Sequence, residues 1–421
     1  MANLKPQDVF RPKSMPLYTY INRMEKTETY EAKLKRALDN PGTLVSIVGA
    51  SKTGKTVLCN KVIDSDKIIN LSGAQIQSQE SFWEQIYEKL DFPMEYQLTE
   101  SEGKADNISG KGAGKVSLPL IASADISAQV GVSKTNNNSV MQKHIRNNSK
   151  IIKMIIEEDM TLIIDDFHYI NPDVQKYIAR TLKTELFNGL KAILLSLPHR
   201  SDDAIRRNPD LIGRTSFIEI KSWTKDELSQ IAKTGFGLLD IPLSEESIEK
   251  ISVESAGSPQ LMQENCLNLA YLMIENKMTS ASESAIKKAF QITTENYKHY
   301  EDILSHVLVG PSQGKVKRKK YYTKDNKVYD IYHLLLLSIS INPPILELHT
   351  DEILRRMMKL LKEDEEPPTK LNIANPAKYI ATEIRKSIPD LDTIEWKDGT
   401  IYILDPFLLF YLRWTDEWKQ H

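Results

Sequence analysis

Short apolar runs alternate with amphipathic stretches through the first half of the chain. The runs are rich in Val, Ile and Leu and favour buried strands, whereas the amphipathic stretches carry apolar residues at helical spacing. Strands are expected at residues 43–48, 67–71, 161–166, 191–196 and 216–220. Helices are expected at residues 25–38, 57–63, 81–90, 145–157 and 172–183. Strands that alternate with helices predict a parallel sheet covered on both faces, which is the α/β class.

From Trp223 onward the pattern is all-helical. Thr224 and Glu227 have the spacing of a capping box, so a helix is expected to begin there. Helical patterns then continue to about Leu304. A helical lid that follows the α/β domain is therefore predicted.

A last unit begins near residue 328. Its pattern predicts an apolar helix, a second helix, and a third helix that Asn375 and Pro376 open. A hairpin with Asp398 and Gly399 at its turn follows, and an apolar segment closes the chain. This order of helices and hairpin predicts a winged helix.

These patterns divide the chain into consecutive parts. They are an extended lead-in (1–24), an α/β domain (25–222), a helical lid (223–307), a basic linker (308–327) and a winged-helix domain (328–421). Residues 97–140 break the pattern of the α/β domain, because they are rich in Gly, Ser and Asn. This surface insertion is either a hairpin or a disordered loop.

Composition adds few constraints to this organisation. The chain has 421 residues and a net charge of −2, so any attraction to nucleic acid has to be local. Cys59 and Cys266 are the two cysteines, which indicates neither a disulfide framework nor a cysteine metal site. The N-terminus has no apolar signal core, and the apolar runs are too short to span a bilayer. We expect a cytoplasmic protein that makes no use of a membrane.

The most specific motif follows the first predicted strand and reads G-x-x-x-x-G-K-T, a phosphate-binding P-loop. Glycines let the backbone turn tightly and aim successive N–H groups at phosphate oxygens, and the following helix adds the positive end of its dipole. Lys55 is expected to reach the β- and γ-phosphates of ATP, and the Thr56 hydroxyl to bind Mg²⁺. The expected nucleotide-binding residues are Gly49, Ala50, Ser51, Lys52, Thr53, Gly54, Lys55, Thr56 and Val57.

Asp165 and Asp166 end an apolar strand, which is the Walker B arrangement. Asp165 would hold Mg²⁺, largely through water, because Mg²⁺ keeps much of its hydration shell. Asp166 would orient or deprotonate the attacking water. The long gap between Thr56 and Asp165 is explained by the insertion at residues 97–140.

Two further polar positions are candidates for catalysis. Ser196 ends the next strand, where a polar group can contact the attacking water or the γ-phosphate. Arg214 precedes the last strand and either projects into the nucleotide of a second subunit or belongs to a solvated basic turn. Arg206 and Arg207 are weaker candidates for the same role.

Taken together, these motifs resemble those of the AAA+/STAND ATPases, most closely the branch near the origin-recognition ATPases. In that family Ser196 would correspond to sensor 1 and Arg214 to the arginine-finger region. The resemblance also implies that Gly257, Ser258 and Pro259 bring the lid onto the nucleotide, although a simple turn between helices remains open. Gln260 occupies the position where many relatives have a sensor-2 arginine, which favours slow switching over fast hydrolysis.

The sequence therefore predicts an ATP-dependent switch that forms a homo-oligomer and engages a protein effector on a separate chain, in prokaryotic signalling or antiphage defence. A DNA-binding loader or regulator is the first alternative, and a nucleotide-binding scaffold without turnover is the second. DNA could be bound by the third helix of the winged helix or by the basic linker, whose charges could equally be solvated. The linker cations are Lys315, Lys317, Arg318, Lys319 and Lys320.

Overall fold

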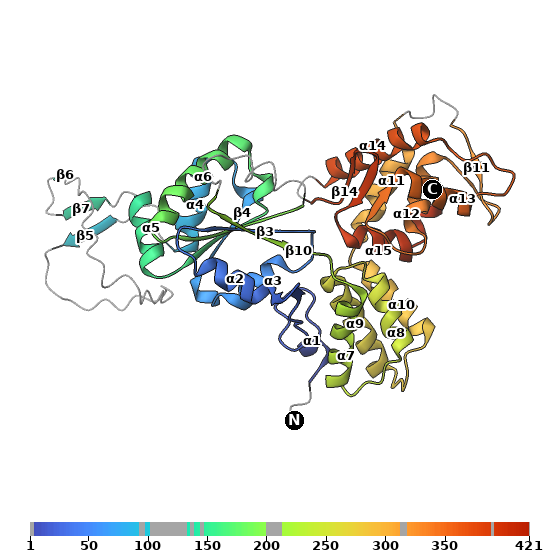
Figure 1. Cartoon of the computed structure of the whole chain (residues 1–421), viewed down its shortest axis with the longest axis horizontal. Coiled ribbons are helices and arrows are strands. Elements are labelled where there is room, and N and C mark those ends of the chain that lie inside the picture. The colour runs from blue at the N-terminus through green and yellow to red at the C-terminus, as the bar shows by residue number, and fades with distance from the viewer. Residues whose placement is uncertain are drawn as a thin grey trace.

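The computed structural model shows a sheet domain beside an all-helical lid and a C-terminal unit (Figure 1). The residues that it describes are 4–91, 97–101, 133–134, 139–143, 147–198, 213–311, 318–388 and 391–420. Among these residues no helix is both long enough and apolar enough to cross a membrane.

The sheet domain is built on a five-stranded sheet in the order β10-β3-β9-β8-β4, and every neighbouring pair is parallel. The strands are β3 (Leu44–Gly49), β4 (Ile68–Ser72), β8 (Thr161–Asp165), β9 (Lys191–Ser196) and β10 (Thr215–Ile220). All of the strands predicted for this domain are present, and the predicted α/β class is confirmed. The P-loop strand β3 lies between β9 and β10, and the Walker B strand β8 lies on the far side of β9.

Side chains of β8 show how the sheet separates two apolar layers. Leu162 and Ile164 pack on one face with α4 (Gln79–Lys89), α5 (Asn148–Glu157) and α6 (Pro172–Phe187). Ile163 points to the opposite face, which α2 (Tyr30–Leu38) and α3 (Lys55–Val62) cover. This alternation is the period of two that a strand imposes on its side chains.

Two N-terminal predictions need correction. The helix expected from residue 25 begins at Tyr30, because Met24–Glu25 (β1) and Glu28–Thr29 (β2) pair as a small hairpin and Thr29 caps α2. The lead-in is not uniformly extended, since it contains α1 (Pro6–Val9). The Phe10 ring packs against Phe236 of the lid, with centroids 5.2 Å apart.

Three short strands lie at the borders of the insertion. They form an antiparallel sheet in the order β5-β7-β6, from β5 (Gln97–Ser101), β6 (Ser133–Lys134) and β7 (Ser139–Lys143). The remainder of the insertion lies outside the described residues. The strands stand apart from the main sheet at the edge of the sheet domain (Figure 1).

The first four helices of the lid each begin at a Ser or Thr side chain that caps them. Thr224 and Glu227 form the predicted capping box at the start of α7 (Lys225–Leu238), and Ser258 caps α9 (Pro259–Glu275). The other lid helices are α8 (Glu245–Glu254), α10 (Glu283–Glu295) and α11 (His299–Val309).

The C-terminal unit has the order helix, strand, helix, helix, strand, strand. These elements are α12 (Ile331–Ser340), β13 (Glu347–His349), α13 (Thr350–Leu360), α14 (Lys370–Ser387), β14 (Ile394–Lys397) and β15 (Thr400–Ile403), followed by α15 (Pro406–Trp414) and η6 (Glu417–Gln420). The three strands form an antiparallel sheet, and Asp398 and Gly399 both have positive φ at the predicted turn. A further hairpin, β11 (Tyr321–Tyr322) with β12 (Val328–Tyr329), precedes α12.

The predicted start of the third helix is wrong. Thr369 caps α14 through a capping box with Asn372, and Pro376 lies inside the helix rather than at its first position. The buried side chains of Ile373, Ala377 and Ile380 follow helical spacing through this proline. Their packing outweighs the loss of one backbone donor at Pro376.

One apolar core continues from the lid into the C-terminal unit. Its buried members include Phe236 and Phe290 of the lid together with Phe407 and Phe410 of α15. The Phe290 and Phe410 rings meet edge to face with centroids 5.4 Å apart. The layers of the sheet domain form separate clusters. The lid and the C-terminal unit are therefore one packed body, here called the lid–C-terminal body (residues 223–311 and 318–420).

Candidate nucleotide-binding site

The P-loop joins β3 to α3, and its backbone geometry favours glycine at two positions. Gly54 has φ 95° and precedes the first residue of α3, Lys55. A Cβ on Gly49 would lie 2.8 Å from the carbonyl oxygen of Ile220, so β10 leaves no room for a side chain there. Lys52 also has a positive φ, 62°, and Thr53 donates its hydroxyl to the Ala50 carbonyl at 2.8 Å. The loop therefore turns tightly around the N-terminus of α3, where free N–H groups favour an anion.

Lys55 is folded back over this loop. Its Nζ donates to the carbonyl oxygens of Gly49, at 2.9 Å, and Ala50, at 3.0 Å. Burial lowers the pKa of the Lys55 ammonium, and the Asp165 and Asp166 carboxylates oppose that shift. The two carbonyl oxygens thus hold the Lys55 ammonium within the loop. Phosphate oxygens are charged and would accept its hydrogen bonds more strongly than these carbonyl oxygens do.

Thr56 and Asp165, predicted as the metal-binding pair, are in contact. The Thr56 hydroxyl donates to Asp165 Oδ2 at 2.9 Å, although 109 residues separate the two positions. The other oxygen of Asp165 accepts the N–H of Asp166 at 2.9 Å. A hydroxyl and a carboxylate side by side are oxygen ligands of the kind that Mg²⁺ prefers, with phosphate and water completing its shell.

Asp166 lies in the left-handed region with φ 53°. Burial and the neighbouring Asp165 raise the pKa of the Asp166 carboxyl, while His168 and Lys55 lower it. Gly73, after β4, packs against the same turn, because a Cβ there would lie 2.4 Å from the Asp166 carbonyl oxygen. Gly73 thus fixes the end of β8, a role that the sequence motifs did not indicate.

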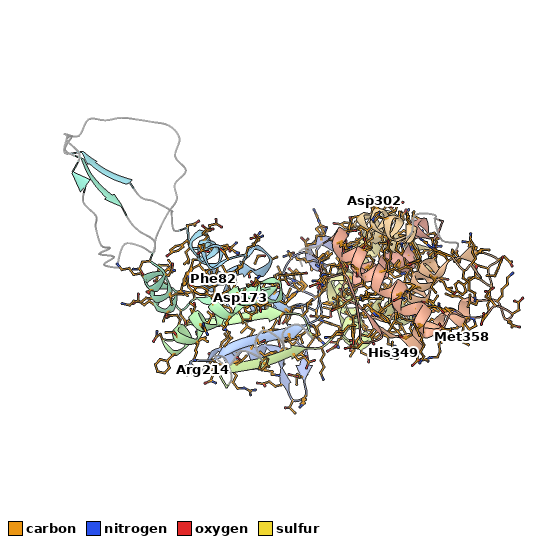
Figure 2. All side chains as sticks on the ribbon, turned by 90° about the horizontal axis from the view of Figure 1, so that it is seen from above. Phe82, Asp173, Arg214, Asp302, His349 and Met358 are labelled. Carbon is orange, nitrogen blue, oxygen red and sulfur yellow. The ribbon has the colours of Figure 1, made fainter. Side chains whose placement is uncertain are left out.

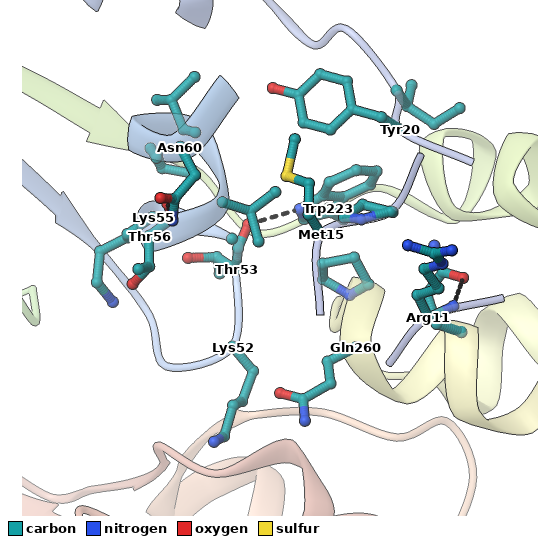
Figure 3. A pocket seen from close by; sticks show the side chains of 18 of the residues that line it. Arg11, Met15, Tyr20, Lys52, Thr53, Lys55, Thr56, Asn60, Trp223 and Gln260 are labelled. Carbon is teal, nitrogen blue, oxygen red and sulfur yellow. Dashed lines mark hydrogen bonds between the residues drawn. The ribbon is translucent and has the colours of Figure 1, made fainter. Parts of the chain in front are cut away.

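The lid reaches the P-loop through Trp223, whose indole Nε1 donates to the Thr53 carbonyl at 2.9 Å (Figure 3). A cavity of about 590 Å³ lies between the two parts of the molecule, and Pro259 and Gln260 of α9 line its lid side. The side chains of Gln260 and Lys52 extend in the same direction, toward the ribbon of the C-terminal unit (Figure 3). The P-loop residues from Ser51 to Val57 line the opposite side.

The N-terminal segment closes the remaining side of the cavity, which the sequence did not predict. Residues 11–16, Thr19 and Tyr20 line it, and the Arg11 N–H donates to Gln263 of α9 at 3.1 Å. Tyr20 donates to Glu31, and the Lys61 ammonium lies over the Tyr20 ring at 5.1 Å. Proline-rich composition gave no sign of this role, because the segment folds onto a helix far away in sequence.

Arg23 holds the connection between the sheet domain and the lid. Its guanidinium donates to the carbonyl oxygens of Lys221 and Ser222 and forms an ion pair with Glu227 at 3.0 Å. The same group lies over the Trp223 ring at 4.6 Å. Residues 221–224 therefore form the connection between β10 and the lid.

Ser196 and Arg214 lie outside the cavity lining. Ser196 pairs with Val48 beside the P-loop, but its side chain is buried and its hydroxyl has no partner among the described residues. Arg214 lies at the opposite end of the strands from the P-loop, because β10 pairs Thr215 with Leu44, at the start of β3, and Ile220 with Gly49, at its end. Six residues of strand place Arg214 about 20 Å from the P-loop. It lines a hollow of about 450 Å³ with Arg180, Lys183 and Phe187. Figure 2 shows Arg214 on the side of the sheet domain away from the C-terminal unit.

The C-terminal unit also reaches the Walker B end of the sheet. His168, three residues after Asp165, lies with its Nε2 2.9 Å from Asp392 Oδ2, and both side chains are buried. No sequence pattern indicated this contact, because its partners are 224 positions apart.

Two of the predicted linker cations are engaged in the C-terminal unit. Arg318 pairs with Asp330 at 2.6 Å, and Lys319 pairs with Glu366 at 3.2 Å. Lys315 and Lys317 lie outside the described residues, as do Arg206 and Arg207. Arg318 is therefore committed to its own unit rather than available to a phosphate.

The residues present fit ATP with Mg²⁺. The loop offers backbone donors and one ammonium to phosphates, and the Thr56–Asp165 pair offers oxygen atoms to a cation. The cavity volume is within the range of small-molecule sites, about 300–1,000 Å³. This chemistry and the parallel sheet define the fold of a P-loop NTPase.

No family model matches the chain, and no curated protein matches it either. Among solved structures, it is similar to Cdc6p from Pyrobaculum aerophilum, with 14% identity, 98% of each chain covered and a TM-score of 0.44. A Walker-type ATPase of Pyrococcus abyssi has 15% identity over 93% of this chain and 96% of its own, with a TM-score of 0.49. The ORC2 protein of Aeropyrum pernix, in complexes with ADPNP and ADP, has 14% identity over 93% and 94%, with a TM-score of 0.45. At these values the fold is assigned from the strand order and the P-loop of this chain itself.

Proposed function

We propose that this protein is an ATP-dependent molecular switch that binds ATP with Mg²⁺ between its sheet domain and its lid and hydrolyses it slowly. The observation that carries the proposal is the cavity that Lys55, Thr56 and Asp165 share with Pro259 and Gln260. A molecule that contacts both walls stabilises the arrangement in which the walls face each other. Binding and loss of a phosphate would therefore bias the position of the lid.

Each residue of the site has a role in this proposal. The P-loop N–H groups and Lys55 bind phosphate oxygens, and Thr56 and Asp165 hold the cation. Bound ATP supplies a cleavable phosphoanhydride bond. Asp166 accepts a proton from water, and the raised pKa of its carboxyl suits a general base better than an ordinary aspartate. Gln260 contributes no positive charge from the lid, which is consistent with slow turnover.

The moving part of the proposed switch is larger than the C-terminal unit alone, because this unit shares its apolar core with the lid. Separating them would expose Phe290, Phe407 and Phe410, which are 1% exposed or less. In the proposed switch the whole lid–C-terminal body therefore turns about residues 221–224.

Assembly is the second part of the proposal. Arg214 cannot reach its own P-loop, which lies at the other end of the strands, so any catalytic role requires a second copy of the chain. The proposed active form is therefore a homo-oligomer, in which Arg214 stabilises charge at a neighbouring site. A protein effector on a separate chain, in prokaryotic signalling or antiphage defence, completes this proposal, and a cytoplasmic location remains a prediction.

Domain movement can be measured with two dyes. Cys59 and Cys266 are buried, so new cysteines at Lys176 on α6 and Lys359 on α13 would be labelled selectively. We expect ATP with Mg²⁺ to change energy transfer between the dyes, and phosphate release to reverse the change. Unchanged transfer at saturating ATP would contradict the switch. ATP binding without phosphate release would instead support a nucleotide-binding scaffold that does not hydrolyse ATP.

DNA binding is a second candidate function, because one face of α14 favours it. Asn375, Lys378, Thr382 and Arg385 are exposed at helical spacing along this helix, and no carboxylate lies among them. Among the described residues Lys378 and Arg385 form no ion pair, so both are available to phosphates or base edges. A helix of this kind in a winged helix enters the major groove.

Salt dependence separates this candidate from the first. If α14 binds DNA, Lys378→Ser with Arg385→Ser should reduce the salt slope of binding by about 0.9 for each phosphate that the protein no longer neutralises. Lys287→Ser with Lys288→Ser removes the same charge from an exposed face of the lid and serves as the control. Equal slopes for both double variants would exclude α14 as the DNA-binding surface.

A further inference from the structure

We propose that Asp392 of the C-terminal unit is a positioning residue for the nucleotide site, which holds His168 beside the Walker B strand and so keeps the lid–C-terminal body closed on the sheet domain. The inference rests on the proposed function and assigns a specific contact to the closed state. The contact is called the His168–Asp392 latch below.

The latch has the geometry of a strong hydrogen bond. A carboxylate oxygen can only accept, so His168 Nε2–H donates to Asp392 Oδ2 across 2.9 Å. The side chains are 2% and 7% exposed, so water competes little for either group. His168 Nδ1 has no partner among the described residues, which leaves Nε2 to orient the ring. Hydrogen bonds to a charged group are stronger than neutral ones, especially where water is excluded.

His168 is rigidly joined to the catalytic end of β8. It lies in a short 3₁₀ turn, Phe167–Tyr169, that begins directly after Asp166. The Gln175 amide donates to the Phe167 carbonyl at 3.0 Å, and Gly73 packs against the Asp166 backbone. A displacement of the His168 ring is therefore transmitted to Asp166 rather than absorbed by a loop. Both His168 and Asp392 are close enough to Asp166 to influence the pKa of its carboxyl.

Asp392 belongs to the body that carries the opposite wall of the cavity. It lies just before β14, in the unit whose core is continuous with the lid. Pro259 and Gln260 therefore move with Asp392. The latch, the Trp223–Thr53 hydrogen bond and residues 221–224 together fix this body to the sheet domain. Loss of the latch should favour an open form in which the cavity walls separate.

Single and double variants test the latch. We expect Asp392→Ala and His168→Ala each to speed dissociation of a fluorescent N-methylanthraniloyl ATP analogue about tenfold, which is the effect of losing one hydrogen bond to a charged group. We expect the same variants to lower energy transfer between dyes at residues 176 and 359. The effects of the two substitutions should not add, because each of them removes the same hydrogen bond.

Matched controls separate positioning from general damage. Glu347→Ala removes an exposed carboxylate from β13, and His306→Ala removes an exposed imidazole from α11; both should leave dissociation unchanged. His168→Gln retains an N–H donor and should restore dissociation to within about twofold of the original rate. If Asp392→Ala does not fold, Asp392→Asn keeps the shape of the side chain while removing its charge, and an increase in dissociation is still expected.

Several outcomes would overturn the inference. Dissociation and energy transfer that match the Glu347→Ala control would show that the contact does not hold the body closed. Additive effects of the two substitutions would show that the residues act independently. If the original protein binds no nucleotide, the proposed function fails, but energy transfer in nucleotide-free protein still distinguishes a latched body from a free one.

Discussion

Arg413 of α15 and Glu254 of α8 form a two-pronged ion pair between the C-terminal unit and the lid. Arg413 Nε and Nη2 donate to the two carboxylate oxygens of Glu254 at 2.8 and 2.6 Å, and the side chains are 6% and 8% exposed. The Trp414 indole donates to the same carboxylate at 2.8 Å. This polar contact lies beside the apolar core that makes the two units one body.

Removal of one partner should destabilise that body. In Arg413→Met the Glu254 carboxylate would remain buried without its counter-charge, and losses of about 3–5 kcal/mol are typical of such changes. Urea unfolding monitored by tryptophan fluorescence measures the effect. Glu249→Gln, which breaks the exposed Lys225–Glu249 pair, is the control and should change little. A shared core would be contradicted if the C-terminal unit unfolded in urea while the lid stayed folded.

Lys55→Ala should weaken ATP binding by about a hundredfold or more, because the loop loses the ammonium that is best placed to donate hydrogen bonds to phosphate oxygens. The unfolding midpoint should not fall, since burial of an ammonium is itself costly, as the lowered pKa of Lys55 indicates. Titration with labelled ATP and a thermal melt measure the two effects. Lys176→Ala on the exposed face of α6 is the control. Unchanged ATP affinity in Lys55→Ala would exclude the P-loop as the site.

Asp166→Asn should retain ATP binding and slow hydrolysis by about 10²–10⁴-fold, the usual contribution of a general base. Because the pKa of Asp166 is raised, the acid limb of the original rate profile should lie above the pH at which an ordinary aspartate titrates. The variant should lose that limb. Single-turnover phosphate release across pH measures both effects. Full turnover in the variant would remove Asp166 from this role.

Arg214→Ala should lower turnover only where the protein assembles, because Arg214 and the P-loop lie at opposite ends of the paired strands β3 and β10. Turnover measured over a range of protein concentrations, with light scattering at each one, tests this dependence. Mixing Arg214→Ala with Lys55→Ala should partly restore activity, since each variant supplies the group that the other lacks. An equal loss in the monomer would point to a structural role.

Asp330 should make the C-terminal unit sensitive to acid. Burial by itself would raise the pKa of Asp330, but hydrogen bonds from His333 and Arg318 outweigh burial and hold the pKa well below its ordinary value. The unfolded chain then binds more protons in acid. The stabilising effect is present above the ordinary aspartate pKa and is lost as the pH falls through the folded value.

Unfolding of the Asp330→Asn variant in urea measures this effect across pH. The variant should be less stable near neutral pH by about 1–3 kcal/mol, and the difference should shrink on acidification. Asp364→Asn changes an exposed carboxylate of the same unit and is the control. A difference that does not depend on pH would mean that Asp330 acts through packing instead of charge.

Local signals explain what could be predicted from the sequence. The P-loop and the Asp165–Asp166 pair were found because each is encoded within one strand and the turn that follows it. The strands were predicted because each is a short, continuous run of apolar residues, such as Leu162, Ile163 and Ile164. The hairpin turn at Asp398 and Gly399 is equally local, since both residues tolerate positive φ.

The remaining features depend on long-range packing. Pro376 indicated a helix start, but apolar contacts carried α14 through it. The role of Gly73 depends on how closely β4 approaches the turn after β8. Arg11 lies beside Gln263 and His168 beside Asp392 only after the lid has folded onto the sheet domain. A single sequence carries no periodic signal for such contacts.

The continuous core of the lid and the C-terminal unit also sets the scale of movement. In the proposed switch, residues 221–224 form the pivot. Gly257, three residues before Gln260, packs against Ser222 and Trp223 at this pivot, whereas α14 lies in the more distant C-terminal unit (Figure 1). A rigid arm multiplies displacement in proportion to its radius. A small tilt that closed the cavity around a phosphate would therefore carry the exposed face of α14 through a larger arc, so that a local change at the nucleotide would alter which partners this face can contact.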